Sequence, residues 1–368
     1  MNLSDASSLL PRLPPGAQIL IVRLRSLGDV VLTTPALAVL HSWRPDLRVS
    51  VLVEKAWAGV LEGNPCVSEI LIAEAPFATG LAMRRRGFSV VFNQHGGPSS
   101  ALITLLTGAP ARVCWTARQF SFAYNVLVPP AEEFFGSRPV HTAEHRVTQF
   151  YWTGLPRAPV PPATVFPQPD AAESVQRMLG NRGIRKGTRY VVFQPGARYF
   201  TKRWAVEKFA AVARWLEERH SVRAIVIAGP GERQIAADLQ THFGAATILD
   251  RLGLRELIAL IAGARLYVGN DAGPMHLAAA LQVPTAAIFG SSSSIYWRPW
   301  GSPHRVVQND FPCNPCRGDR CYAFDEPKCI VSIDVEQVGR ACEELLQAEK
   351  SEAEALPTKR APGAGTGA

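Results

Sequence analysis

The chain has 368 residues, of which 47% are hydrophobic and 19% charged, and its formal net charge is +8. The length favours two domains, and the composition favours a globular protein with a sizeable core over a disordered one. The longest apolar run, HLAAALQVPTAAIFG, is interrupted by Gln282 and Pro284 well short of the ~20 residues that cross a bilayer. The N-terminal stretch has no basic start typical of a signal peptide, so we expect a cytoplasmic protein.

The basic residues are spread along the chain, without a basic tail or an aromatic and basic repeat. This distribution argues against nucleic acid as a partner. A mildly basic surface suits an acidic substrate or an anionic membrane face. An odd number of cysteines, seven, together with the expected lack of a signal peptide, indicates a reducing compartment.

From Gln18 onward, short runs rich in Val, Ile and Leu alternate with longer amphipathic stretches. The first half contains, in order, QILIVRLR, DVVLTTPALAVLHSW, RVSVLVEK, FSVVFNQHGG and SSALITLLTG. This alternation is typical of repeated βαβ units on a parallel sheet. The proline-rich residues 155–168 predict a linker, and the same alternation restarts after them.

The sequence therefore predicts an α/β protein of two Rossmann-like domains that face each other across a cleft. We expect a flexible N-terminus at residues 1–16, a first domain at 17–160, a second at 161–345 and a disordered tail at 346–368. Ligands of such sheets bind at the carboxyl ends of the strands. The loops that follow the apolar runs are therefore the candidate site.

The loop RLRSLGDVV joins the first predicted strand to the first helix. Gly28 allows a tight turn there, and Asp29 falls where the helix begins. Asp29 has two interpretations: a helix N-cap, or a general base that faces the cleft. The helix dipole keeps such a carboxylate ionised but weakens it as a base.

Residues 194–204, QPGARYFTKRW, follow the first predicted strand of the second domain. Thr201, Lys202 and Arg203 precede a helix predicted to begin near Val206. Basic and hydroxyl groups beside a helix N-terminus form a candidate anion site. The alternative is a solvated Lys–Arg pair in a loop.

Residues 228–234, AGPGERQ, form a glycine-containing turn after the next predicted strand. Glu232 is placed to accept hydrogen bonds from ribose hydroxyls. An ordinary turn with a glutamate in the first turn of a helix fits equally well.

Residues 268–281, VGNDAGPMHLAAAL, interrupt an apolar segment with polar groups. Asp271 suits sugar hydroxyls, Gly273 lets a diphosphate approach the backbone, and His276 lies one turn into the helix, within reach of phosphates. A capped core helix is the alternative.

In this order and spacing, GDVVLTTPAL, PGARYFTKRW, GPGE and NDAGPMHLA resemble the motifs of the ADP-heptose:lipopolysaccharide heptosyltransferases of glycosyltransferase family 9. The resemblance extends from about Gln18 to Val338. It implies the two-Rossmann GT-B fold, with the donor nucleotide bound mainly by the second domain and the acceptor by the first. It also implies inverting transfer of heptose from ADP-heptose to the inner core of lipopolysaccharide, without a covalent sugar–enzyme intermediate.

The resemblance further implies a role for each motif residue. Asp29 is then the base that deprotonates the acceptor hydroxyl, and Lys202, with Thr201, stabilises the departing diphosphate. Glu232 lies near the ribose. The contacts with the donor sugar and phosphates fall to the loop and helix start that contain Asp271, Ala272, Gly273 and His276.

The chain departs from the family pattern at Ala272, where many members have Thr or Ser, so one hydroxyl is missing from the donor site. No two aspartates have the Asp-x-Asp spacing that holds a divalent cation in other sugar transferases. We therefore expect no catalytic metal and no required cofactor. Helix dipoles and Lys202 then have to stabilise the leaving group.

The segment CNPCRGDRCYAFDEPKC concentrates four of the seven cysteines: Cys313, Cys316, Cys321 and Cys329. Four cysteines that begin with a CxxC pair form a candidate structural zinc site. Four reduced, partly buried thiols are the alternative. A similar segment occurs in the second-heptose branch of the family, so the resemblance is closest to heptosyltransferase II.

Arg84, Arg85 and Arg86 form the only run of three arginines, in the predicted acceptor domain. Such a run is usually a solvated surface. Our hypothesis is that it docks a phosphorylated, lipid-linked acceptor, in peripheral contact with the cytoplasmic face of the inner membrane. The aromatic cluster YWRPW, residues 296–300, either lines the cleft or packs between the domains.

The predicted function is thus that of a heptosyltransferase. One alternative is a family relative that uses another sugar nucleotide or acceptor. The other is a non-catalytic nucleotide-binding module, which has no need of a carboxylate such as Asp29 in the opposite domain.

Overall fold

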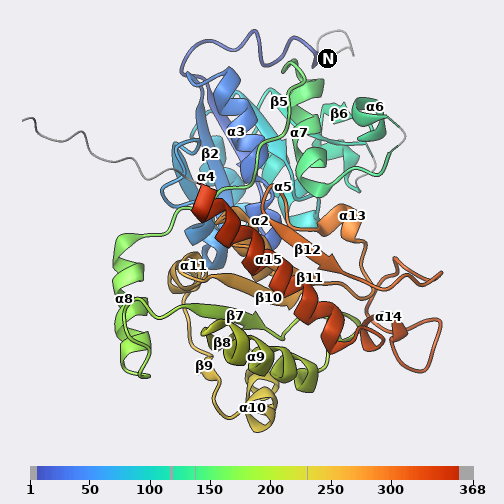
Figure 1. The fold of residues 1–368 in the computed structure, drawn as a ribbon. Helices are drawn as coiled ribbons and strands as arrows, with labels where there is room; N and C mark the ends of the chain where they lie inside the picture. The colour runs from blue at the N-terminus through green and yellow to red at the C-terminus, as the bar shows by residue number, and fades with distance from the viewer. Residues whose placement is uncertain (1–5, 117–118, 137, 230, 356–368) are drawn as a thin grey trace, which may run out of the picture.

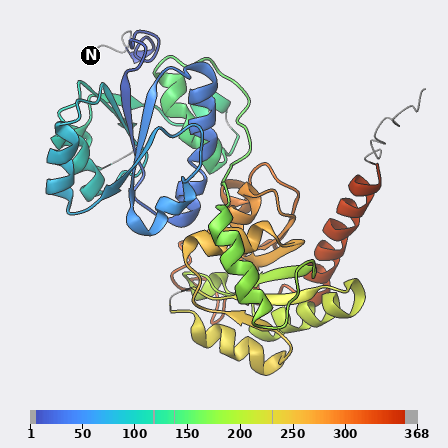
Figure 2. The same cartoon turned by 90° about the vertical axis from the view of Figure 1, so that its left-hand side faces the viewer.

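The computed structural model describes residues 6–116, 119–136, 138–229 and 231–355. The described chain folds into two lobes, each built around one sheet (Figure 1). The proline-rich residues 155–168 have neither helix nor strand and connect the lobes. In the side view the two lobes lie one above the other, and the connecting chain passes from one to the other beside the place where they approach (Figure 2). The predicted two-domain α/β fold is confirmed.

The first domain contains a parallel sheet of six strands in the order β3-β2-β1-β4-β5-β6. Its strands are β1 (Gln18–Val22), β2 (Arg48–Glu54), β3 (Glu69–Ala73), β4 (Val90–Asn93), β5 (Ala111–Trp115) and β6 (Val126–Val128). Its helical segments are α2 (Leu27–Val31), α3 (Thr34–Trp43), η1 (Lys55–Val60), α4 (Pro76–Arg84), α5 (Pro98–Leu106), η2 (Ser121–Ala123), α6 (Glu132–Phe135) and α7 (Thr142–Trp152).

The second domain repeats this plan with the strand order β12-β11-β10-β7-β8-β9. Its strands are β7 (Tyr190–Gln194), β8 (Arg223–Ile227), β9 (Thr247–Leu249), β10 (Leu266–Asn270), β11 (Thr285–Ile288) and β12 (His304–Val307). Its helical segments are α8 (Pro169–Gly180), η3 (Phe200–Lys202), α9 (Val206–His220), α10 (Arg233–His242), α11 (Leu254–Ala262), α12 (Gly273–Ala280), α13 (Ser294–Trp297), α14 (Lys328–Val331) and α15 (Val335–Ala355).

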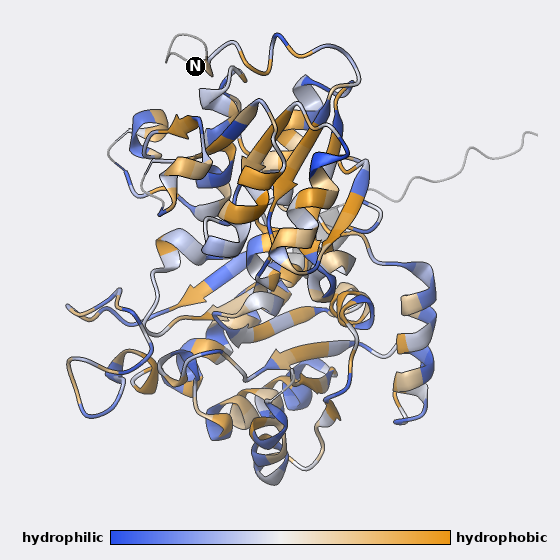
Figure 3. Ribbon diagram, turned by 180° about the vertical axis from the view of Figure 1, so that it is seen from behind, coloured by the Kyte–Doolittle hydropathy of each residue, from blue (hydrophilic) through white to orange (hydrophobic). Residues whose placement is uncertain are grey.

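The apolar runs of the sequence form the interiors of both sheets. Strands β4, β7 and β10 are buried along their whole length, because helices cover both faces of a parallel sheet. The strands are mostly hydrophobic, whereas the helices contain both hydrophobic and hydrophilic residues (Figure 3). One cluster of buried apolar residues continues from α2 of the first domain into α12 of the second. The domains therefore share part of their core.

The N-terminal segment is packed rather than free from residue 6 onward. Leu10 is fully buried, and its N–H donates to the carbonyl of Thr153 at 2.9 Å. Arg44 Nη1 donates to the Leu10 carbonyl at 2.7 Å. The expected flexible start at residues 1–16 is thus not found for residues 6–16, and residues 1–5 lie outside the described ranges.

The C-terminal segment expected to be disordered begins inside a helix. Leu345 and Leu346 are buried, and α15 continues to Ala355. The residues beyond Leu346 are mostly Ala, Glu, Lys and Gln, which are strong helix formers and so extend α15 past its packed part. Residues 356–368 of the predicted tail lie outside the described ranges. Among the described helices, none is both long and apolar enough to span a bilayer.

Candidate functional site

The two sheets place their binding edges at equivalent positions. In each sheet the strand order reverses beside the first strand, between β1 and β4 in one and between β7 and β10 in the other. Such a reversal opens a crevice outside the carboxyl ends of the two strands, where open α/β sheets bind ligands. The segments that follow these four strands contain most of the predicted site residues.

Asp29 lies in the first turn of α2, shortly after the end of β1. The N-cap of α2 is Ser26, whose backbone N–H and hydroxyl donate to Asp29 Oδ2 at 3.4 and 3.1 Å. The other oxygen, Oδ1, accepts a hydrogen bond from Arg146 Nη2 at 2.8 Å and pairs with Arg23. Asp29 is therefore not the N-cap considered above: it closes a capping box with one oxygen and holds two guanidinium groups with the other.

The charges around Asp29 keep it ionised. Burial by itself raises the pKa of Asp29, but Arg23, Arg146 and the Ser26 hydrogen bonds outweigh it and hold that pKa below its ordinary value. Neither arginine is among the site residues predicted from the sequence. Arg23 directly follows the buried strand β1, and a charged residue at that point could have been recognised as a site residue. Arg146 lies on a distant helix, α7, and no sequence pattern connects it with Asp29.

His95 follows β4 and lies near Arg23, Arg25 and Asp29. Burial, with the charges of Arg23 and Arg25, lowers the pKa of His95 to about 4. This imidazole is therefore neutral at physiological pH, beside an ionised Asp29.

A cavity of about 430 Å³ opens at this edge of the first sheet and is shared by both domains. Its first-domain lining consists of Arg23, Arg25, Ser26, Asp29, His95, Thr142, His145 and Arg146, and its second-domain lining of Arg198 and Trp297. Four arginines and one carboxylate line this space, so it favours an anionic ligand. We call it the cationic cavity.

A second cavity, of about 410 Å³, adjoins the first and shares Thr142, His145 and Trp297 with it. Its remaining lining is mostly apolar or aromatic: Trp115, Thr116, Pro130, Ala131, Glu132, Val140 and Tyr296. Together the two cavities form a trough with a charged end and an aromatic end. Within the YWRPW cluster, Tyr296 and Trp297 thus line the trough, while Trp300 stacks on His141 of the first domain, so both interpretations of the cluster apply.

Lys202 and Asp271 meet at the crevice of the second sheet. Lys202 is the last residue of η3, and its Nζ lies 2.6 Å from Asp271 Oδ2, which also accepts a hydrogen bond from Ser292. Asn270, at the end of β10, holds the preceding loop in place: its Nδ2 donates to the Pro195 carbonyl at 2.8 Å, and its Oδ1 accepts from the Trp204 N–H at 3.1 Å. Hydrogen bonds and an ion pair therefore connect the predicted basic segment, residues 194–204, to the predicted acidic loop that contains Asp271.

Glu232 connects two of the predicted loops. It is the N-cap residue of α10, and its Oε2 accepts the Gly229 N–H at 2.9 Å. A Cβ on Gly196 would lie 2.1 Å from the Glu232 carboxyl carbon, so this carboxylate is in contact with the PGAR turn. Glu232, Lys202 and Asp271 thus gather at the same edge of the second sheet.

The domains meet at the helix starts of α2 and α12. His276 is buried, and a Cβ on Gly28 would lie 2.5 Å from His276 Cδ2. A Cβ on Gly273 would lie 2.9 Å from Leu27 Cβ. The sequence predicts that Gly28 allows a turn and that Gly273 lets a ligand approach the backbone. In addition, the lack of a side chain at each position lets the two domains pack closely together.

His276 lies between the two halves of the site. Burial lowers its pKa, while the carboxylates of Asp271 and Asp29 act in the opposite direction. In this conformation its ring faces Gly28, not open space. Ala272, the N-cap of α12, offers no side-chain hydroxyl at this position.

Substitution of Gly28 by alanine is expected to separate the two domains locally. The added Cβ has to displace the ring of His276, and overpacking of this kind costs about 1–3 kcal/mol. We expect a lower melting temperature. The double variant Gly28→Ala/His276→Ala, which removes the ring, should recover the melting temperature; no recovery would show that the close contact is not the cause.

Arg84, Arg85 and Arg86 lie apart from the trough, at the end of α4. All three are exposed, and Arg86 pairs with Glu69. None is among the residues that line either cavity. If these arginines bind the acceptor, as predicted, they therefore bind a part of the acceptor that extends out of the trough.

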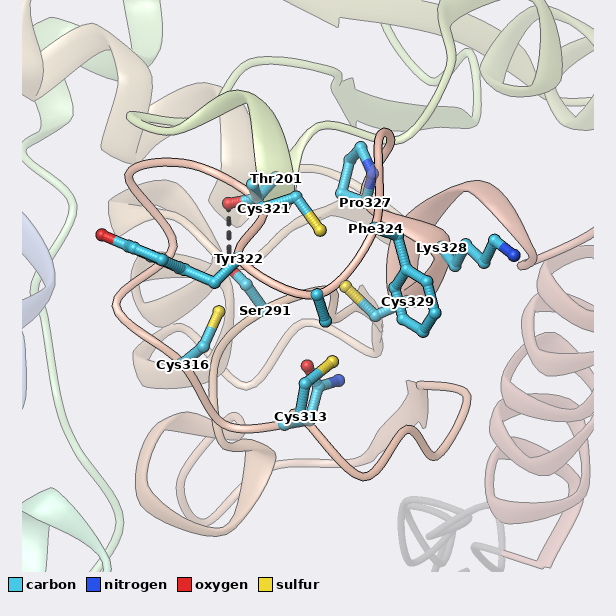
Figure 4. Close-up of a pocket in the computed structure, with 12 residues that line it drawn as sticks. Thr201, Ser291, Cys313, Cys316, Cys321, Tyr322, Phe324, Pro327, Lys328 and Cys329 are labelled. Carbon is cyan, nitrogen blue, oxygen red and sulfur yellow. Dashed lines mark hydrogen bonds between the residues drawn. The ribbon is translucent and has the colours of Figure 1, made fainter.

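The four clustered cysteines gather in one place. Cys313, Cys316, Cys321 and Cys329 line a small cavity with Thr201 and Ser291, and their sulfur atoms point into it from different sides (Figure 4). All four are free thiols. In the described part of the chain, no three His, Cys, Asp or Glu side chains are already arranged as ligands of one metal ion.

Comparison with known proteins identifies relatives over most of the chain. The family model glycosyltransferase family 9 (heptosyltransferase) matches residues 77–324. Lipopolysaccharide heptosyltransferase 3 of Escherichia coli is 27% identical over 76% of this chain and 85% of its own length. Lipopolysaccharide heptosyltransferase 1 of Pseudomonas aeruginosa is 26% identical over 91% of this chain and 99% of its own length. Among solved structures, E. coli ADP-heptose lps heptosyltransferase II superposes with a TM-score of 0.76 at 20% identity, over 90% of this chain and 99% of that one.

Proposed function

The chain belongs to glycosyltransferase family 9, the heptosyltransferase family, and from this premise we propose that it transfers heptose from ADP-heptose to a sugar of the lipopolysaccharide inner core. The observation that carries the proposal is the junction of α2 and α12. It brings an ionised carboxylate of the first domain, Asp29, towards the Lys202–Asp271 pair of the second, with His276 between them. A nucleotide-binding module needs only the second half of this arrangement.

Asp29 is the proposed general base. An acceptor hydroxyl in the cationic cavity gives its proton to a carboxylate oxygen of Asp29, and the hydroxyl oxygen attacks the anomeric carbon of the heptose. The bond between that carbon and the diphosphate oxygen breaks in the same displacement, which inverts the anomeric configuration. Arg23 and Arg146 already hold the carboxylate in one orientation, so little reorganisation is required.

Lys202 is the proposed stabiliser of the leaving group. The oxygen that leaves with ADP gains negative charge, and a fixed cation lowers the energy of that charge most where water is excluded. Lys202 is one-fifth exposed and lies beside Thr201. Asp271 and Glu232 are the proposed partners of donor hydroxyls, because both carboxylates lie at the same edge of the sheet. No divalent cation enters this scheme.

The trough is the proposed acceptor site. Its arginines suit phosphate or carboxylate groups of a lipopolysaccharide core, and its aromatic end suits the apolar face of a sugar ring. Relatives of types 1, 2 and 3 match this chain at similar identity. We propose the type II acceptor, a core that already carries one heptose, on the resemblance of the cysteine segment.

The experiment that tests this function measures ADP release with two acceptors. Purified full-length protein receives ADP-heptose together with either a heptose-primed lipid A core or the same core without heptose. Release that depends on the primed core is expected. Release only with the unprimed core would replace the type II assignment. Tight binding of ADP-heptose without release for any core would favour a binding module, and turnover only with another sugar nucleotide would favour a different donor.

Arg84–Arg86 are the proposed contact with the cytoplasmic face of the inner membrane. On α4, Phe77 and Leu81 are exposed at 61% and 38%, and the adjoining α5 exposes Leu102. Arginines next to exposed apolar side chains suit a membrane with anionic lipids, at about 1 kcal/mol for each basic residue.

Replacement of Arg84, Arg85 and Arg86 by serine is expected to weaken binding to anionic vesicles at least tenfold, because Arg86 is already paired and two free charges are lost. Co-sedimentation with vesicles of mixed neutral and anionic lipid measures it. The matched control replaces three exposed basic residues of the second domain, Arg182, Arg185 and Lys186. Equal losses in both variants would show a general charge effect and overturn the docking assignment.

A further inference from the structure

Residues 308–327 form a long loop with neither helix nor strand, between β12 and α14. Only Gly318 and Pro327 are buried in it. A compact domain seldom keeps a loop of this length without a function or a further constraint. Apolar packing therefore does not explain how this loop holds its shape.

The loop brings three cysteines to a fourth. Cys313 and Cys316 begin it, Cys321 lies in its far part, and Cys329 belongs to the following helix, α14. The cavity that they line measures about 20 Å³, which admits one water molecule or one ion and no organic ligand. The four sulfur atoms point into this space from different sides (Figure 4).

We propose that Cys313, Cys316, Cys321 and Cys329 bind one thiophilic divalent ion, zinc or iron, in a tetrahedral site. Each thiol that becomes a ligand releases its proton to solvent, so that four thiolates and the ion carry a net charge of −2. Arg317, Arg320 and Lys328 lie in the same segment, but Asp319, Asp325 and Glu326 balance them, so the segment itself is neutral. In the described residues the sulfurs are not already arranged around one ion, so metal binding requires them to rotate about the single torsion of each cysteine side chain.

The site is connected to the donor loop. The Cys316 N–H donates to the Ser291 carbonyl at 2.9 Å, and the Gly318 carbonyl accepts a hydrogen bond from Thr201 Oγ1. Thr201 Oγ1 also lies 3.0 Å from Ser291 Oγ. An ion that fixes the cysteine loop therefore also fixes the turn that carries Lys202. In this respect the inference rests on the proposed function, with the ion as a positioning element and not a participant in the reaction.

The test begins with metal content, which does not depend on activity. Full-length protein is purified under reducing conditions, incubated with excess zinc or with ferrous iron under anaerobic conditions, and dialysed. About one equivalent of one metal is expected for the wild type and for Cys66→Ser, a cysteine outside the cluster. Cys313→Ser and Cys316→Ser should lower the retained metal at least tenfold. Equal retention by all variants, or none by the wild type, would overturn the site.

Cobalt substitution and thiol titration keep the proposal testable if a variant does not fold. Wild-type protein loaded with cobalt alone should show the sulfur-to-cobalt charge-transfer absorption of a thiolate site. Of the seven cysteines in the chain, four should become protected from a thiol reagent when zinc is present. A spectrum without thiolate bands, or unchanged protection, would contradict the ligand set.

A binding experiment then examines the link to the donor loop. Removal of the metal is expected to weaken ADP binding about tenfold, and restoration of zinc should reverse the loss. If ADP binds equally with and without metal, the site is unconnected to the donor loop. If metal is retained but no sugar transfer occurs with any donor, the proposed function fails and the metal site stands.

Discussion

Replacement of Asp29 by asparagine is expected to lower kcat for heptose transfer by about 10²- to 10⁴-fold, the range that general-base catalysis supplies. Asparagine has nearly the same shape, but it cannot take a proton from the acceptor hydroxyl. Its single acceptor oxygen can serve either Ser26 or the arginines, so the variant also loses the ion pairs with Arg23 and Arg146. The dissociation constant for ADP-heptose should change little, because Lys202, Asp271 and Glu232 lie in the other domain. Single-turnover ADP release and equilibrium binding measure the two quantities separately.

The control for this variant is Asp46→Asn. Asp46 is also paired with an arginine of the first domain, Arg44, at 2.6 Å, but it lines neither part of the trough. It should keep kcat within about a factor of two. A similar loss in both variants would mean that a broken ion pair, and not a lost base, explains the effect of Asp29→Asn.

The pH dependence gives a second test of the same assignment. Arg23 and Arg146 hold the pKa of Asp29 below its ordinary value of 3.8, so Asp29 stays ionised as pH falls from 8 to 5. We therefore expect kcat/KM to show no acid limb in that interval. Arg146→Gln removes one of the two cations and should move the limb to higher pH. A wild-type limb near neutral pH would contradict Asp29 as the base in this environment.

The fold followed from the sequence because its signals are local. Apolar runs such as QILIV and YVVFQ and the helix-length stretches between them set the strands and helices, and a parallel sheet follows from their alternation. The prediction is wrong at two places: it assigns Leu10 to a flexible start, and the last part of α15 to a disordered tail. Both assignments rest on amino-acid composition and take no account of packing. Leu10 looks like part of a polar lead-in, yet it fills a space beside α7 that no sequence pattern describes.

The site could be predicted only in part. Asp29, Lys202, Glu232 and Asp271 all follow strands, so their clustering at the sheet edges is dictated by topology. The partner of Asp29 on α7, Arg146, is distant in sequence and has no pattern that links it to the GD motif. The glycines illustrate the same limit: Gly28 is recognisable as a turn residue, but its contact with His276 exists only once two domains have met.

Replacement of Lys202 by methionine is expected to lower kcat by about 10²- to 10³-fold, as loss of one fixed group that stabilises developing negative charge usually does. Methionine keeps the length and apolar volume of the side chain and removes the charge. The measurement is kcat and KM for ADP-heptose at a saturating concentration of acceptor. Lys186→Met, which removes an exposed lysine of the same domain, is the control and should leave both constants unchanged.

The Lys202 variant also leaves a buried carboxylate without its cation, because Asp271 is only 7% exposed. Loss of one partner of a largely buried pair costs a few kcal/mol in the free energy of unfolding, so lower activity could reflect a weakened fold. The double variant Lys202→Met/Asp271→Asn removes the unpaired charge and separates these causes. It should regain much of the melting temperature, while its kcat stays about 10²-fold below that of Asp271→Asn alone, the variant that accounts for the donor contact of Asp271, since the leaving diphosphate still lacks its cation. Recovery of kcat along with stability would show that Lys202 supports the fold and does not stabilise the leaving group.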